Sequence, residues 1–121
     1  MVDLKQMLNR FLAIPGVRQA ILVGRDGLVI DGLMREGKED MEAVGAITTT
    51  SLGAAESLGK EISRGSLTGV IMEYERGLVS VEPLGDFAII VTLFDNASNI
   101  ARIRHMVKSC RNDILGALDI A

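Results

Sequence analysis

Short turns between apolar segments constrain the fold of this chain more than any other feature of its sequence. The stretch ILVGRDGLVIDG, residues 21–32, places two apolar runs on either side of Asp26-Gly27. Further along, LTGVIMEYE and LVSVEPL flank Arg76-Gly77, and DFAIIVTLF follows a turn at Gly85-Asp86. An antiparallel pair of strands closes with a tight turn, whereas a parallel pair needs a long crossover connection. These turns therefore predict antiparallel β-strands.

Three other segments have apolar residues at helical spacing. In the first segment, apolar residues recur every three or four positions and form a stripe that begins with Leu4, Met7 and Leu8. The second is expected over about residues 41–62, and the third carries a stripe that includes Cys110 and Ile114. The expected caps and stops are Asp3, Pro15-Gly16, Asp40, and Asp95 or Asn96.

This element order, α-β-β-α-β-β-β-α, predicts an α+β fold in a single domain over residues 1–121. We expect a five-stranded antiparallel sheet with the second helix on one face. The first and third helices, which have wide apolar stripes, are expected on the other face.

Composition excludes several classes of function. The net charge is −3 and the chain has no Trp, which argues against a nucleic-acid partner bound through phosphate contacts or base stacking. The lone Cys110 rules out an internal disulfide and fits a reducing compartment. No segment has the pattern of a signal peptide, and none is apolar for the roughly 18 residues of a membrane span. A soluble, cytoplasmic protein without membrane insertion is expected.

The second helix is rich in poor helix formers. It contains Gly45, Gly53 and Gly59 as well as three consecutive threonines, and each glycine costs about 1 kcal/mol relative to alanine. The face expected to pack on the sheet comprises Met41, Val44, Thr48, Leu52, Ala55, Leu58 and Ile62. A polar strip comprises Glu42, Thr49, Glu56 and Lys60.

Between these two faces lies a seam of mostly small residues at heptad spacing. Its members are Ala43, Ile47, Thr50, Ala54 and Ser57. Small side chains allow two helix backbones to approach closely, and dispersion over that contact offsets the low helix propensity. We interpret the seam as a subunit interface with the same helix of a twofold-related copy. The alternative is that the chain's own terminal helices cover it.

The sequence resembles the roadblock / dynein light chain family over roughly residues 4–115. The resemblance rests on LAIPGVRQAILVGRDGLVI, LGKEISRGSLTGVIMEYERGLVSVEPLGDFAIIVTL and NIARIRHMV. Its specific parts are Ile14-Pro15-Gly16-Val17, Asp26-Gly27, Gly65-Ser66-Leu67 and Pro83-Leu84-Gly85-Asp86. The short chain is most similar to bacterial members of the MglB type.

This resemblance implies a roadblock, profilin-like architecture and a homodimer in which the second helices pack together. It also implies that the third strands pair across the twofold axis, which places Val70 and Met72 at the interface. An exposed apolar edge strand invites such pairing, so the same dimer is indicated independently by this strand. The implied partner is a small Ras-like GTPase of the MglA type, which such proteins activate by repositioning the switch residues of the GTPase.

Two surfaces are candidates for partner binding. The polar strip of the second helix would form one composite platform beside its copy near a dimer axis. On the third helix, Arg104, Lys108 and Arg111 form a basic edge, which is either an ordinary solvated face or a docking site for an acidic partner. His105 is expected at the surface and Cys110 in the core.

No catalytic, cofactor-binding or metal-binding motif is found, and GAAESLGKE, residues 53–61, departs from the phosphate-loop pattern. We therefore expect a non-enzymatic module that binds and regulates a small GTPase. The alternatives are an adaptor or scaffold of a signalling or motor complex without effect on GTP hydrolysis, and a small-molecule sensor. Heterodimers and larger assemblies also remain open.

Overall fold

The computed structural model describes residues 3–118 and contains the expected elements in the expected order. In chain order they are α1 (Leu4–Leu12), β1 (Val17–Gly24), β2 (Val29–Met34), α2 (Met41–Glu61), β3 (Val70–Tyr74), β4 (Gly77–Leu84), β5 (Ala88–Phe94), a short 3-10 turn η1 (Ala97–Asn99) and α3 (Ile100–Ala117). Asp3 and Asp40 cap α1 and α2 with their side chains, as the sequence predicts.

The five strands form one antiparallel sheet in the order β2-β1-β5-β4-β3. The three tight turns join neighbouring strands, which confirms the antiparallel prediction. The central contact, however, pairs β1 with β5, so the first and last strands of the chain lie side by side. This leaves β2 and β3 as the two edges of the sheet.

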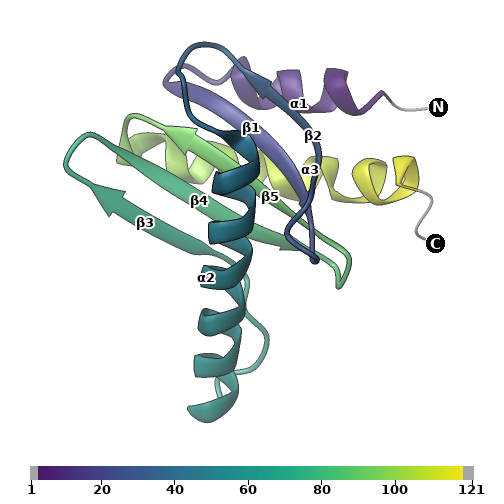
Figure 1. Ribbon diagram of the computed structural model, residues 1–121, viewed down its shortest axis with the longest axis vertical. Helices are drawn as coiled ribbons and strands as arrows, with labels where there is room; N and C mark the ends of the chain where they lie inside the picture. The colour runs from purple at the N-terminus through teal and green to yellow at the C-terminus, as the bar shows by residue number, and fades with distance from the viewer. Residues whose placement is uncertain (1–2, 119–121) are drawn as a thin grey trace.

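The helices cover the sheet as predicted, with α2 on one face and α1 and α3 on the other. Figure 1 shows α2 in front of the sheet and the other two helices behind it. Successive strand residues point to opposite faces, so Leu22 and Ile90 join the core under α1 and α3, whereas Ile21 and Val91 join the core under α2.

The Ile14-Pro15-Gly16-Val17 motif joins α1 to β1, and it contacts Asn99 just before α3. The Asn99 side chain donates a hydrogen bond of 2.7 Å to the Pro15 carbonyl. Gly16 has a φ of +95°, and a Cβ atom there would lie 2.7 Å from Asn99 Oδ1. Glycine is therefore required both by the backbone conformation and by the close approach of Asn99.

Two predicted boundaries are wrong. The third strand begins at Val70, opposite Val81, rather than at Leu67, because residues 67–69 pass close to the side of β4 without joining its ladder. The third helix begins at Ile100, after η1. Neither expected cap acts there, because Asp95 binds Arg18 at 2.7 Å and the Asn96 side chain makes no capping hydrogen bond.

The predicted packing of α2 holds only for its first half. Thr48 and Leu52 are buried against the sheet, but Leu58 and Ile62, expected on the same face, are 60% and 52% exposed. The reason is length. A helix of 21 residues spans about 31 Å at about 1.5 Å per residue, and Figure 1 shows its C-terminal half extending beyond the sheet.

Candidate functional site

The seam of α2 faces away from the sheet. All five of its residues, Ala43, Ile47, Thr50, Ala54 and Ser57, are exposed. Ile47 is 66% exposed, which is unusual for a large aliphatic side chain on a helix. The alternative that the terminal helices cover this seam is wrong, because α1 and α3 pack on the opposite face of the sheet.

The three glycines of α2 have different structural roles. A Cβ atom at Gly45 would lie 3.3 Å from side-chain atoms of Val23 and Val29, so this glycine brings α2 close to its own sheet. Gly59 lies close to the connection that follows the helix, because a Cβ atom there would lie 3.3 Å from the Gly65 carbonyl oxygen. Only Gly53 faces open space within the described chain. The small size of Gly45 is therefore explained by packing within its own protomer.

Four consecutive hydroxyl side chains of α2, at residues 48–51, are bonded to the helix itself. Thr48 donates to the Val44 carbonyl at 2.7 Å, and Thr49 donates to the Gly45 carbonyl at the same distance. Thr50 and Ser51 make equivalent bonds four residues back. This pattern satisfies the hydroxyls within the helix and leaves an outer surface with few free polar groups.

The polar strip of α2 is only partly free. Glu42 and Lys60 are exposed, whereas Thr49 and Glu56 are half-buried. Arg25, in the turn between β1 and β2, donates two hydrogen bonds to the Glu56 carboxylate at 2.8 and 3.2 Å. This hydrogen bonding lowers the pKa of Glu56 below its ordinary value. Glu56 thus fixes α2 to the hairpin.

Strand β3 is an edge strand with an apolar inner face. Val70 and Met72 are partly buried and pack toward the core under α2. On its outer side, β3 has no neighbouring strand within residues 3–118. At the end of this edge strand, Tyr74 is 62% exposed.

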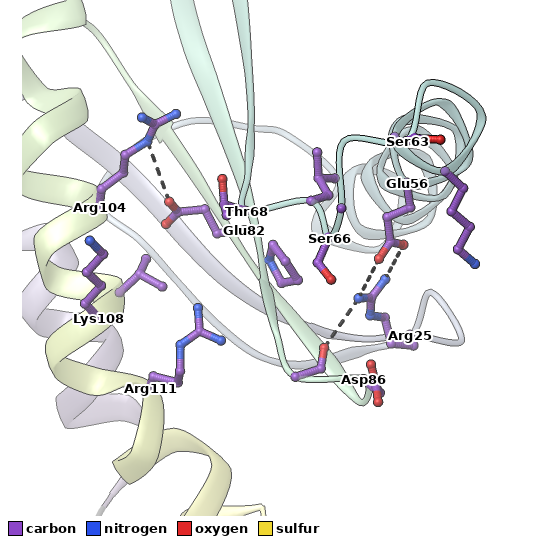
Figure 2. Close-up of a pocket in the computed structure, with 17 residues that line it drawn as sticks. Arg25, Glu56, Ser63, Ser66, Thr68, Glu82, Asp86, Arg104, Lys108 and Arg111 are labelled. Carbon is purple, nitrogen blue, oxygen red and sulfur yellow. Dashed lines mark hydrogen bonds and ion pairs between the residues drawn. The ribbon is translucent and has the colours of Figure 1, made fainter.

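The basic edge of α3 lines a groove at the end of the sheet. We define the α3 groove as the hollow of about 840 Å³ between α3, the end of β4, the connection 63–69 and the C-terminal part of α2. Figure 2 shows Arg104, Lys108 and Arg111 on one wall and Arg25 with Glu56 on the other. The basic edge and Lys60, predicted as parts of separate surfaces, therefore line one groove.

Between the walls lies Glu82, a carboxylic acid that the sequence analysis missed. Its side chain is 7% exposed, and Arg104 Nε lies 3.8 Å from Glu82 Oε1. Glu82 Oε2 is buried and has no hydrogen-bond partner within the described residues. Burial raises the pKa of Glu82 above its ordinary value, and the positive charges of α3 oppose the rise.

A signal for Glu82 is present in the sequence. Leu78, Ser80, Glu82 and Leu84 alternate along β4 and share the face that α3 covers. A glutamate at an inward position of an apolar strand requires a partner from the covering element. The basic stripe of α3 has the matching charge.

The remaining titratable candidates lie where they were expected. His105 is exposed on α3. Cys110 is buried, with Arg10 Nη1 3.8 Å from its sulfur. Among residues 3–118, no three acidic, histidine or cysteine side chains gather as a metal site. The same part of the chain has no helix with the length and apolarity to cross a membrane.

Solved structures with this fold include several proteins of the predicted type. Myxococcus xanthus MglB superposes with a TM-score of 0.82 at 15% identity, covering 99% of this chain and 100% of that one. A structure described as MglB with tetrameric arrangement has a TM-score of 0.79 at 19% identity, covering 88% and 81%. A Roadblock/LC7 domain from Streptomyces avermitilis has a TM-score of 0.76 at 20% identity, covering 94% and 99%.

The chain also has sequence relatives and matches a family model. The uncharacterized proteins MJ0310 and MJ1340 of Methanocaldococcus jannaschii are each 35% identical over 99 residues, which is 82% of this chain and 85% of theirs. Residues 3–94 match the model of the Roadblock/LC7 domain. The chain therefore belongs to the Roadblock/LC7 domain family.

Proposed function

We propose that this protein is a homodimeric, non-enzymatic module of the cytoplasm that binds and regulates a small Ras-like GTPase of the MglA type. The outer surface of α2 carries the proposal. It combines an exposed seam of small residues with large apolar side chains, Ile47, Leu58 and Ile62, that the chain leaves in water. Exposed apolar residues that cluster on one surface typically mark a protein interface.

The proposed dimer joins the α2 seams and the β3 edges of two copies. Ala43, Thr50, Ala54 and Ser57 would allow close helix contact, and Ile47 would be buried there. The half of α2 that extends beyond its own sheet would then contact the partner. Pairing of β3, which carries Val70 and Met72, with its copy would satisfy the open edge. The neighbour described as having a tetrameric arrangement supports self-association as a use of this fold.

The polar strip of α2 is the proposed GTPase-binding surface. In a dimer built on the seam, the strips of both copies lie beside the twofold axis and form one platform. Because Arg25 holds Glu56, the exposed charges of each strip are those of Glu42 and Lys60. The family resemblance and the MglB neighbours support a GTPase as the partner.

Charge within the seam tests the dimer. We expect Thr50→Glu and Ala54→Arg to shift the protein from dimer to monomer in sedimentation velocity, because each places a charge between two closely packed helices. Both positions are exposed, so circular dichroism should show an unchanged fold. Intact dimers in both variants would exclude the seam as the interface.

Single-turnover GTP hydrolysis tests the regulatory function. The purified protein should accelerate hydrolysis by candidate small Ras-like GTPases, beginning with any encoded beside its gene. Lys60→Glu should weaken the effect, whereas Lys38→Glu, on the exposed connection before α2, should leave it unchanged. Binding without acceleration would favour an adaptor or scaffold, and absence of binding would reject the proposal.

A further inference from the structure

We propose that the α3 groove binds an acidic peptide segment of a partner protein. No residue of the seam and neither Val70 nor Met72 lines the groove, although it shares Glu56 and Lys60 with the polar strip. It also does not require the GTPase function. The partner is identified by three properties of the groove: its charge, the open hydrogen-bonding capacity of Glu82, and its shape.

The charge of the groove is opposite to that of the chain. The protein as a whole has a net charge of −3, yet five basic and three acidic side chains line this hollow. Of the three acids, Glu56 is bound to Arg25 and Glu82 is buried. Such a local reversal of sign concentrates an anionic partner at this surface and repels it elsewhere.

Most of the basic side chains are available to a ligand. Lys60, Lys108 and Arg111 have no carboxylate oxygen within 4.0 Å among residues 3–118. Arg104 is held only by the 3.8 Å contact with Glu82, which is longer than a hydrogen bond. The two walls therefore offer separate positive groups to an extended chain of carboxylates.

Glu82 selects a peptide over a simple anion. Its Oε2 atom is a buried acceptor without a donor in the described chain, and leaving such an atom unsatisfied is unfavourable. A peptide supplies backbone N–H groups between its acidic side chains, so it can satisfy Glu82 and the basic walls together. A polyanion without N–H groups can contact only the walls.

The shape of the groove fits an extended segment. The ladder between β3 and β4 begins at Val70 and Val81, so beyond this point β4 is flanked by the connection 63–69. The hollow is open to solvent, and hydroxyls of Ser63, Ser66 and Thr68 line it. Pockets for small ligands are usually lined by apolar and aromatic side chains, whereas no aromatic side chain of the described residues lines this groove.

Fluorescence anisotropy tests the proposal with a fluorescein-labelled oligo-glutamate peptide. We expect the wild-type protein to bind this peptide, with an affinity that falls as salt is added, and not to bind oligo-lysine. The combined variant Arg104→Gln, Lys108→Gln, Arg111→Gln should bind about tenfold more weakly. A wild-type protein that fails to bind oligo-glutamate would overturn the proposal.

A matched control separates the groove from net charge. The combined variant Arg35→Gln, Lys38→Gln, Arg102→Gln changes the net charge equally at exposed positions outside the groove. It should bind the peptide like the wild type. Equal weakening by both combined variants would show a nonspecific charge effect and overturn the groove as the site.

A second peptide tests the role assigned to Glu82. Oligo-glutamate with N-methylated backbone amides keeps its carboxylates and loses its N–H donors. We expect it to bind several-fold more weakly than the unmodified peptide. Equal binding of the two peptides would show that the groove accepts any polyanion, which would overturn the assignment of a peptide ligand.

Discussion

Glu82 shows how one residue can determine the character of a surface. An apolar strand with a glutamate at an inward position must either neutralise the acid or surround it with positive charge. Here burial raises the pKa of the carboxyl group, and the charges of three basic side chains of α3 oppose that rise. The basic edge of α3 is therefore neither a plain solvated face nor an isolated patch.

The raised pKa of Glu82 predicts a pH-dependent stability. The folded chain binds the Glu82 proton more tightly than the unfolded chain does. The free energy of unfolding therefore falls as the pH rises from the ordinary value of 4.5 through the folded pKa. Glu82→Gln has no such proton to lose. We expect its Tm to exceed that of the wild type at neutral pH by about 4 °C, and the difference to shrink below pH 4.5.

Thermal denaturation followed by circular dichroism across this pH range measures the effect. Glu75→Gln, in the exposed turn between β3 and β4, is the control and should show no comparable gain. A Glu82→Gln variant that is less stable than the wild type at neutral pH would show that the contact with Arg104 outweighs the cost of burial.

At the scale of an element, α2 combines two kinds of poor helix former. Gly45 is small because the sheet lies against it, and the threonines return their hydroxyls to the helix backbone. Gly53 has no such reason within the described chain, since nothing lies within 4 Å of the place for its Cβ. The sequence shows these glycines as equivalent, and only packing distinguishes them.

Two alanine substitutions separate these roles. Gly53→Ala should raise the free energy of unfolding of the dilute protein by about 1 kcal/mol, because alanine is the better helix former. Gly45→Ala should lower it, because the new methyl group would crowd Val23 and Val29 at 3.3 Å. Urea denaturation measures both changes. Equal stabilisation by the two substitutions would contradict the close packing of α2 at Gly45.

At the scale of the whole molecule, α2 is longer than the sheet that it covers. Its last turns carry Leu58 and Ile62 into solvent, although both follow the periodicity of the packed face. A single protomer leaves both residues more than half exposed. In the proposed dimer these side chains would contact a second copy, which would make the stability of the protein depend on its concentration.

Paired substitutions at the end of α2 test this dependence. The Tm of the wild type should rise with protein concentration, and the combined variant Leu58→Gln, Ile62→Gln should abolish the rise while keeping the Tm measured at high dilution. Leu28→Gln, Phe87→Gln, which alters other exposed apolar residues at the turns beside the sheet, is the control. A rise of equal size in all three proteins would contradict an interface at the end of α2.

Much of the architecture could be read from the sequence because its determinants are local. Tight turns at Asp26-Gly27, Arg76-Gly77 and Gly85-Asp86 require antiparallel neighbours, and Asp3 and Asp40 start helices with their own side chains. Each of these signals acts within a few residues. Boundaries failed where a distant contact competed, as at Asp95, which binds Arg18 instead of capping a helix.

Tertiary structure alone decided the features on which the proposals depend. The pairing of β1 with β5 joins strands that are far apart in the sequence, the diagonal course of α2 exposes Leu58 and Ile62, and Glu82 meets α3 at the end of the sheet. The periodicity of a segment determines which of its residues share a face. Only the positions of the other elements determine what that face meets, because those contacts join residues that are far apart in the chain.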